Sequence, residues 1–314
     1  MYERCHARQL IHMRIVNTQK WLIVGLGFLT LCATAAEGPP SGLHTSVSLT
    51  PAYIASANID DSGTYESRIL ALNIGMMQPV SARSNVGINF NYSYYENRFN
   101  DANVFSVMEP WGNVERIGLS VPAFIRSNTN WVYFITPSLH FIHEYNADWS
   151  DSLTYGTVLS VSRNFDLKKR IGFGLGVFQQ LEKIKAFPYL VVDWQLTNTL
   201  RVNNPLPAGP TGPAGVELNY RLNSNWELGL GTAYRSVRFR LIDDGPFPGG
   251  VGEENGVIVF LHAATRISGD KTLDLYGGAL LNGELQVEDS RGHDIAQQDL
   301  DTAPMFGMTL GMQF

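Results

Sequence analysis

The chain has 314 residues, of which 44% are hydrophobic and 17% are charged, and its formal net charge is −6. An acidic balance argues against a nucleic-acid partner, because binding to a phosphate backbone requires an excess of clustered Lys and Arg. The composition shows no break in the interior of the chain that would ask for two domains.

An apolar run of eleven residues, WLIVGLGFLTL, occupies positions 21–31. Basic residues precede the run, and small residues follow it up to position 36. This order is typical of a cleaved secretion signal, and the run is too short for a membrane-spanning helix, which needs about 20 residues. We therefore expect residues 1–36 to be a cleaved signal peptide, with Met13 as an alternative start, and residues 37–314 to form one domain.

Both cysteines of the chain, Cys5 and Cys32, lie in this predicted signal peptide. A mature chain without cysteine has no disulfide, no thiol nucleophile and no thiolate metal site. The bulky residue Leu31 disfavours lipidation of Cys32, since a small residue precedes a lipidated cysteine. The sequence predicts no cofactor.

From Leu43 onward one pattern recurs, in which apolar and polar residues alternate over about ten positions before a turn. A period of two is typical of a β-strand with one apolar face, and no helical period interrupts it. Clear examples are VGINFNYSY, WVYFITPSLHF, IGFGLGVF, WELGLGTAY and VIVFLHAAT, at 86–94, 131–141, 171–178, 226–234 and 257–265. The pattern predicts an all-β domain built of antiparallel hairpins.

The connections between these strands alternate in length. The short, polar connections lie at 81–85, 126–130, 165–169, 197–199, 223–225 and 268–271. The other connections are mostly longer and irregular, at 55–64, 97–112, 145–151, 203–213, 242–254 and 287–303, with one short member around Glu182 to Lys185. Short periplasmic turns and long outer loops are typical of outer-membrane barrels, whereas a soluble sandwich has no reason to sort its loops in this way.

Six short turns and seven outer connections join fourteen strands. We therefore predict an all-β protein, a transmembrane antiparallel up-and-down β-barrel of about 14 strands in the outer membrane of a Gram-negative cell. The alternative is a barrel of about 12 strands, because the strand at 199–203 is short. An even number of strands places both chain ends on the periplasmic side.

The parity of the apolar residues assigns the two faces of each strand. In strand 86–94 the polar positions, which include Asn89 and Asn91, face the lumen. The apolar and tyrosine positions that alternate with them face lipid. Aromatic residues cluster at the strand ends, with Trp131, Trp226 and Phe314 near the short turns and Tyr53, Tyr94 and Tyr234 near the long loops. Two aromatic belts at the two membrane interfaces are typical of such barrels.

The chain ends in MFGMTLGMQF, which shows the same alternation. The apolar face consists of Phe306, Met308, Leu310, Met312 and Phe314. This ending resembles the C-terminal signal that the bacterial barrel-assembly machinery recognises in outer-membrane proteins. The resemblance implies that the last strand is an assembly signal and that the machinery is a partner. The same strand must pair with the first one to close the barrel and remove its edges.

Three stretches carry a wider resemblance: GFGLGVF, FPYLVVDWQLTNTLRVNNP and NWELGLGTAYRSVRFRL, at 172–178, 187–205 and 225–241. They resemble an uncharacterised family of bacterial outer-membrane β-barrel proteins that is known only as a domain of unknown function. The resemblance extends over most of the mature chain and implies the fold and the location. It implies no catalytic residue and no substrate.

The inward face is expected to carry charges of both signs. The charged residues and histidines expected to face the lumen are Arg116, His140, Asp193, Arg201, Glu217, Arg221, Glu227, Arg235, His262, Arg266, Asp274 and Glu284. Arg221 and Glu227 should lie opposite each other across a short turn, and Arg266 should lie near Asp274 across the next one. Such pairs either stiffen the wall or form a charged constriction that selects small solutes.

The number of strands does not decide whether the lumen is open. Side chains fill barrels of about eight strands, barrels of about 16–18 strands hold water, and a barrel of fourteen strands is intermediate. Inward glycines leave parts of the wall smooth, for a solute or for an inserted outer loop, at Gly172, Gly174, Gly176, Gly229 and Gly231. The loop NNPLPAGPTGPAG at 203–215 is expected to be a stiff, irregular surface loop. An extended N-terminal plug, as in the long-chain fatty-acid transporters, is not expected, since the first strand starts near Leu43.

Four residues near the outer rim are candidates for other roles. His143 has outward parity and is the candidate base of a lipid-modifying enzyme, although no serine–asparagine motif accompanies it. His140 points to the opposite face, so the two histidines cannot share a metal ion. Arg238 and Arg240 have outward parity and are expected either to contact lipopolysaccharide phosphates or to be solvated.

The leading functional prediction is a passive pore or small-solute transport channel. The alternative is a closed barrel with a structural or surface-interaction role and no transport. A lipid-modifying enzyme is a distant third, and we do not predict an enzyme. Expected partners are outer-membrane lipid with its lipopolysaccharide, and the barrel-assembly machinery. The sequence names no solute and no oligomeric state.

Overall fold

The computed structural model describes residues 42–60, 63–101, 105, 107, 109–206, 209–211 and 214–314. The predicted signal peptide, residues 1–36, lies outside the described residues. No helix in the described part of the chain is long and apolar enough to cross a membrane. The single helical turn in these ranges is the 3-10 turn η1 (Trp149–Ser152).

Sixteen strands form one sheet. The first eight are β1 (His44–Asn58), β2 (Thr64–Ser81), β3 (Ser84–Asn100), β4 (Val114–Ser120), β5 (Ala123–Arg126), β6 (Trp131–Glu144), β7 (Leu153–Asp166) and β8 (Lys169–Gln180). The second eight are β9 (Lys183–Gln195), β10 (Leu200–Asn203), β11 (Gly215–Arg221), β12 (Trp226–Arg240), β13 (Val251–Ser268), β14 (Lys271–Glu288), β15 (Asp294–Leu300) and β16 (Ala303–Gln313).

The sheet closes into a barrel with fourteen strand positions. Each strand pairs antiparallel with its neighbours, and β16 joins β14 on one side and β1 on the other. Two positions are each shared by two strands, so the count is 16 − 2 = 14: β4 and β5 both lie between β3 and β6, while β15 and β16 both pair with β14. The short strand at 199–203 is β10. The prediction of fourteen strands is confirmed, and the alternative of twelve is wrong.

The break between β4 and β5 contains a proline. Pro122, in the break, has no N–H group to donate to the ladder, although β6 and β9 continue through Pro137 and Pro188. Its carbonyl still accepts a hydrogen bond of 2.8 Å from the backbone N–H of Gly87 on β3. The wall therefore stays closed where the strand is interrupted.

The outer face of the barrel is apolar, as predicted from the alternation. Ile88, Leu139, Leu230 and Leu261 all have more than 40% of their surface exposed, although they are large hydrophobic residues. Such a surface is stable only against lipid, and a closed barrel satisfies its backbone hydrogen bonds without water. The chain is therefore an integral β-barrel protein of the Gram-negative outer membrane.

The final strand completes this wall. In β16 the outward residues include Phe306, which is 57% exposed, and Leu310, which is 39% exposed. Phe314 exchanges backbone hydrogen bonds of 3.0 and 3.2 Å with Thr45 near the start of β1. The predicted pairing of the last strand with the first is confirmed.

Inward glycines on β8 are covered by aromatic rings of β9. A Cβ atom at Gly174 would lie 2.1 Å from the ring of Tyr189, and one at Gly176 would lie 2.3 Å from the ring of Phe187. The Phe187 ring also stacks on Phe178 at 5.8 Å. These two glycines therefore make room for neighbouring rings that lie flat on the inner wall, and not for a solute.

We expect Gly174→Ala to destabilise the barrel by about 1–3 kcal/mol, because the added methyl forces the Tyr189 ring out of its place. Urea unfolding of the refolded protein in micelles measures this change. Gly277→Ala is the matched control, since a Cβ there meets only a Phe306 ring atom at 3.9 Å. Equal stability of the two variants would contradict this account of the wall.

Candidate functional site

The candidate site is the lumen, and its outer half is filled by side chains. Inward residues from opposite walls form a cluster of buried hydrophobic residues. Trp111, which is 1% exposed, packs edge-on against Phe239 of β12 at 5.4 Å and against Phe99 of β3 at 5.3 Å. Tyr65 of β2 donates a hydrogen bond of 2.7 Å to a carboxylate oxygen of Glu254 on β13.

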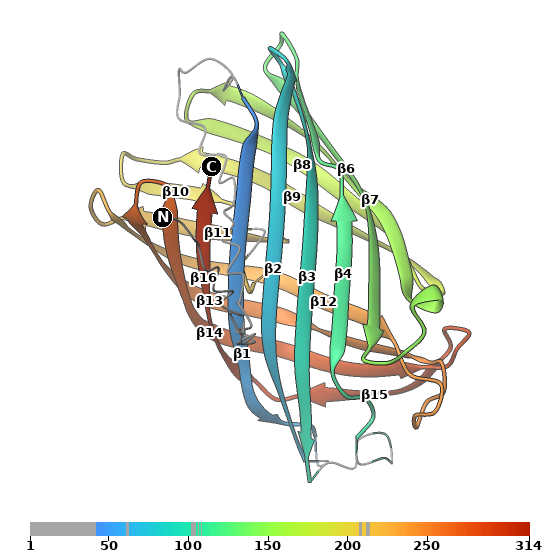
Figure 1. Ribbon diagram of the computed structural model, residues 1–314. Coiled ribbons are helices and arrows are strands. Elements are labelled where there is room, and N and C mark those ends of the chain that lie inside the picture. The colour runs from blue at the N-terminus through green and yellow to red at the C-terminus, as the bar shows by residue number, and fades with distance from the viewer. Residues whose placement is uncertain are drawn as a thin grey trace, which may run out of the picture.

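The walls come together there because β12 reaches β6. The end of β12 forms a parallel bridge to the end of β6, between Arg240 and His143. The carboxylate of Glu144 accepts hydrogen bonds from the backbone N–H groups of Gly112 (2.7 Å) and Ile242 (3.1 Å). Figure 1 shows β12, β13 and β14 crossing behind β1–β3 at a steep angle toward the end of β6.

The bridge reduces the circumference of the outer end. It bypasses the five positions from β7 to β11, which leaves 14 − 5 = 9 positions around the outer core. A barrel of about eight strands is just wide enough for side chains to fill. The periplasmic end keeps all fourteen positions, so the lumen narrows from a wide mouth to a packed tip.

A hairpin covers the outside of this tip. The turn between β8 and β9 lies against the outward face of β12–β14, where Arg238 binds the carboxylates of Glu253 and Glu288. Lys183 binds Glu288 at 2.8 Å, and Lys185 binds Glu253 at 3.1 Å. We call these five residues the clasp, because they connect the hairpin to the tip.

The expectation that Arg238 and Arg240 contact lipopolysaccharide is therefore wrong. Both residues have the predicted outward parity, but the hairpin leaves only 2% and 8% of their surfaces exposed. Arg240 donates to the backbone oxygens of Asp151 (2.9 Å) and Gly249 (2.7 Å) and binds the Glu182 carboxylate. The alternation of residues in β12 predicts which face Arg238 and Arg240 lie on, but it cannot predict that the hairpin between β8 and β9 covers that face.

In the outer part of the wall, beyond the ends of the short strands β10 and β11, side chains join β9 to β12. β10 pairs with β9 only as far as Asp193, and β11 pairs with β12 only as far as Ala233. Beyond these points Asn204 bridges the gap: its side chain accepts from Val192 N–H (3.1 Å) and donates to Leu190 O (2.7 Å) and Gly215 O (2.9 Å). We call this interrupted part of the wall the seam.

The described part of the loop at 203–215 lies inside the lumen, not on the surface as expected. A Cβ at Gly307, an inward position of β16, would lie 3.0 Å from Pro210 Cγ. A Cβ at Gly209 would lie 2.9 Å from the hydroxyl oxygen of Tyr276, another inward residue. Thr211 is fully buried. Small inward residues on β16, and not the glycines of β8, accommodate this loop.

The charged residues of the periplasmic half form separate groups. His262 on β13 lies between two predicted lumen residues, with Nδ1 2.6 Å from Glu217 Oε1 and Nε2 3.0 Å from Asp274 Oδ1. Its ring stacks on Tyr276 at 4.7 Å. His262 has the inward parity that the alternation predicts, but only the register of strands β11 to β14 shows that it joins the two carboxylates.

Other predicted lumen residues pair locally. Arg201 donates to Asp193 at 2.7 Å, and Arg170 from β8 approaches the same carboxylate at 3.8 Å. Arg116 lies 3.5 Å from His140 Nδ1. These residues face the lumen as expected, because their strands keep a regular alternation.

The predicted pairs across short turns are not formed as ion pairs. Arg221 and Glu227 are opposite each other in register, but no ion pair joins them in the described ranges. Asp274 is opposite Ala264 and binds His262, while Arg266 is exposed and opposite Thr272. The charges of Arg221, Glu227 and Arg266 therefore remain near the periplasmic mouth without a partner on the opposite strand.

Glu284 does not line the lumen. A bulge at Asn282, whose φ is 48°, inserts one extra residue into β14 opposite β13. The following residues change face, so that Leu285 enters the buried core while Glu284 accepts from Asn255 (3.2 Å) and Gln297 (2.7 Å) on the outer side. A single extra residue reverses parity, which explains the wrong prediction.

His143 does not lie open to lipid at the outer rim. It has outward parity, but Trp149 of η1 packs on its ring at 4.8 Å and leaves it 1% exposed. Its Nδ1 lies 2.9 Å from the backbone oxygen of Glu144. This arrangement supplies no accessible base at the lipid boundary.

The remaining inner wall of the periplasmic half is polar. Small hydroxyl and amide side chains occupy its inward positions, among them Ser46, Ser48, Thr50, Asn89, Asn91, Ser138, Ser162 and Thr309. The oxygen atoms Ser48 Oγ and Asn91 Oδ1 have no hydrogen-bond partner among the described residues. The inner wall of this half is therefore polar, and these two atoms are covered by neighbouring atoms.

No family model and no curated protein matches the sequence, so the resemblance to the family of unknown function is not confirmed. Among solved structures, the fold is similar to an outer membrane channel from Pseudomonas putida F1, with 11% identity over 88% of this chain and 97% of that chain and a TM-score of 0.49. It is also similar to the toluene transporter TodX from P. putida, with 7% identity over 90% and 91% of the two chains and a TM-score of 0.44.

A homologue of FadL from Pseudomonas aeruginosa is a third similar structure, with 9% identity over 86% of this chain and 88% of that chain and a TM-score of 0.39. Likenesses of this degree carry no information on a solute or a mechanism. The geometry of the lumen is the basis for a functional conclusion.

We expect Arg238→Met to destabilise the barrel by about 3–5 kcal/mol, because it leaves the buried carboxylates of Glu253 and Glu288 without their main cation. Urea unfolding in micelles provides the measurement. Arg98→Met is the control, since Arg98 is 46% exposed in its ion pair with Glu96 and such pairs contribute about 0–1 kcal/mol. Similar losses for both variants would show that the clasp is not a buried ion-pair cluster.

Proposed function

We propose that the protein is an outer-membrane channel for small polar solutes and that its outer end is closed in the arrangement described above. The observation that carries this proposal is the contrast between the two halves of the lumen. The periplasmic half keeps all fourteen strand positions and is lined by small hydroxyl and amide groups, whereas the outer half is filled by an apolar core. A barrel that needed only stability would gain from apolar packing along its whole length.

The segments that close the outer end are held by side-chain contacts, and this supports a barrier that can move. The core is built around Trp111 from the connection between β3 and β4, and around the tip of β12. Beyond Asn204, side chains and not a backbone ladder hold the seam. Contacts of this kind separate without unfolding the rest of the barrel, because the other strand pairs keep their hydrogen bonds.

The outer core also favours a second candidate, a closed barrel with a structural role and no transport. The two candidates differ in what happens when the core is made smaller. A channel conducts once the core is weakened if residues 209–211 leave part of the lumen beside them open, whereas a barrel that is blocked by this loop as well as by the core stays silent.

We expect the double variant Trp111→Gly, Phe239→Ala to give stable conductance steps in planar bilayers and to admit small sugars into liposomes, because it removes two rings that fill the outer lumen. The unmodified protein should conduct rarely. Phe173→Ala, Leu261→Ala is the control, since it removes two large side chains from the lipid-facing side. A double core variant that is folded, as shown by heat-modifiable gel mobility, yet silent would favour the closed structural barrel.

We also infer that β16 acts as a signal for the barrel-assembly machinery. The support is a continuous outward stripe from Phe306 to Phe314 on a strand that closes the barrel. Deletion of Phe314 should lower the amount of assembled barrel in the outer membrane at least several-fold while export to the periplasm continues. Cell fractionation with heat-modifiable mobility measures both amounts. Gln313→Ala, a change on the inward face, should assemble normally, and normal assembly without Phe314 would refute the signal.

A further inference from the structure

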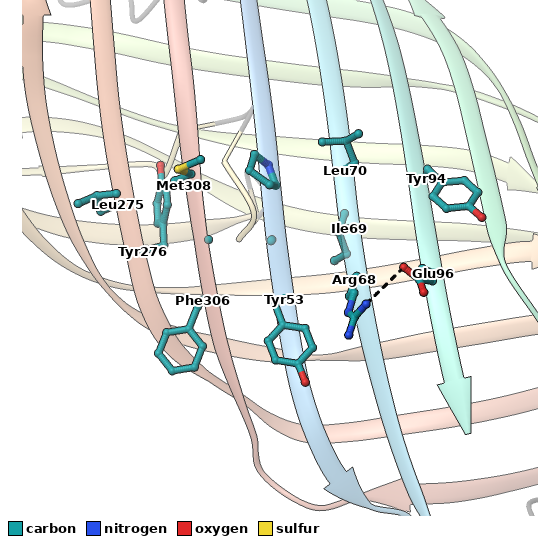
Figure 2. Close-up of a pocket in the computed structure, with 13 residues that line it drawn as sticks. Tyr53, Arg68, Ile69, Leu70, Tyr94, Glu96, Leu275, Tyr276, Phe306 and Met308 are labelled. Atoms are coloured by element: carbon teal, nitrogen blue, oxygen red, sulfur yellow. Dashed lines mark ion pairs between the residues drawn. The ribbon is translucent and has the colours of Figure 1, made fainter. Parts of the chain in front are cut away.

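A groove lies on the lipid-facing side of the barrel, across β14, β16, β1, β2 and β3 (Figure 2). Its volume is about 980 Å³. Two rows of outward side chains border it. The row nearer the periplasm consists of Leu275, Met308, Pro51, Leu70 and Tyr94, and the row nearer the outer rim consists of Phe306, Tyr53, Arg68 and Glu96.

The depth of the groove follows from small residues in the wall. The outer row continues on β14 with Gly277, which is opposite Phe306 and has no side chain. The compact ring of Pro51 lowers the middle of the other row, and Ala52 and Gly307 form the floor between the rows. Since the band around the groove faces hydrocarbon, the apolar part of any occupant is an acyl chain.

The outer end of the groove has a cation with unused hydrogen-bond donors. The Arg68 side chain is 51% exposed, and its guanidinium nitrogens lie 3.9 Å from Glu66 and 3.9 Å from Glu96. Both distances exceed the roughly 2.7–3.2 Å of an N–H···O hydrogen bond. Figure 2 shows the Arg68 side chain at the side of the groove toward which the Tyr53 and Phe306 rings point.

The two carboxylates near Arg68 are held by other groups. Glu96 accepts from Arg98, with its Nε at 3.1 Å. Glu66 accepts from the hydroxyl of Tyr53 at 2.8 Å. Arg68 therefore keeps the planar fork that binds a phosphate through two parallel hydrogen bonds. Tyr53 belongs to the predicted outer aromatic belt and Phe306 is opposite it in register, so we place this fork at the level of the outer headgroups.

We propose that the groove binds an acylated glycolipid phosphate of the outer leaflet, the lipopolysaccharide class, with an acyl chain between the two rows and a phosphate on Arg68. The site differs from Arg238 and Arg240, which the hairpin covers. It is independent of transport, since the side chains of both rows lie outside the lumen.

The test measures how much lipid A stays bound to the purified, refolded full-length barrel by native mass spectrometry, with lipid A as the added probe. Arg68→Gln should retain about tenfold less lipid A at limiting lipid, the factor expected for one lost charge-assisted hydrogen bond. Leu70→Trp, which fills the groove without a change of charge, should also weaken retention. Arg163→Gln is the control, because Arg163 lies 5.7 Å from the Trp131 ring at the periplasmic end.

Heat-modifiable gel mobility shows that each variant is folded. Equal retention by the unmodified protein, Arg68→Gln and Leu70→Trp would overturn the proposal. It would also be overturned if inorganic phosphate displaced lipid A from the unmodified protein as readily as competing lipid A does, because the groove would then contribute nothing and the site would be a simple anion site.

Discussion

Every backbone N–H and C=O group of a membrane barrel must find a partner inside the protein, and the rest of this structure depends on how that requirement is met. The antiparallel pairing of neighbouring strands, closed by the pairing of β16 with β1, provides these partners around the fourteen strand positions. At the seam the ladder stops, and the side chain of Asn204 supplies three of the missing bonds. Above the seam, the ion pairs of the clasp hold the hairpin between β8 and β9 against β12–β14.

This substitution explains the shape of the lumen. Because β10 and β11 are short, β12 is free to bend inward beyond Ala233 and to reach β6. Its inward residues then join those of β2 and β3 in the buried core of the outer half. The charged face of the same strands must be covered, and the hairpin between β8 and β9 covers it with Lys183 and Lys185. An apolar core inside and a buried ion cluster outside are thus two consequences of one bend.

Much of the fold could be predicted from local sequence, because the alternation of side chains and the length of connections are local properties. Three predictions follow from these local properties: the face on which each side chain of strand 86–94 lies, the six short turns, and the closing role of β16. What could not be predicted depends on contacts between distant segments or on single irregular residues. The bulge at Asn282 reversed the face of Glu284, and a hairpin 58 residues away in sequence covered Arg238 and Arg240.

The most direct test of this account is the distance between the ends of β6 and β12 in a bilayer. Asp148, just after β6, and Asp243, just after β12, line the same small outer cavity of about 460 Å³. Spin labels at these two positions should therefore give a single short distance by pulsed electron paramagnetic resonance. A long distance, comparable to the width of an open fourteen-stranded barrel, would show that β12 does not reach β6 and would contradict the closed, narrowed outer end.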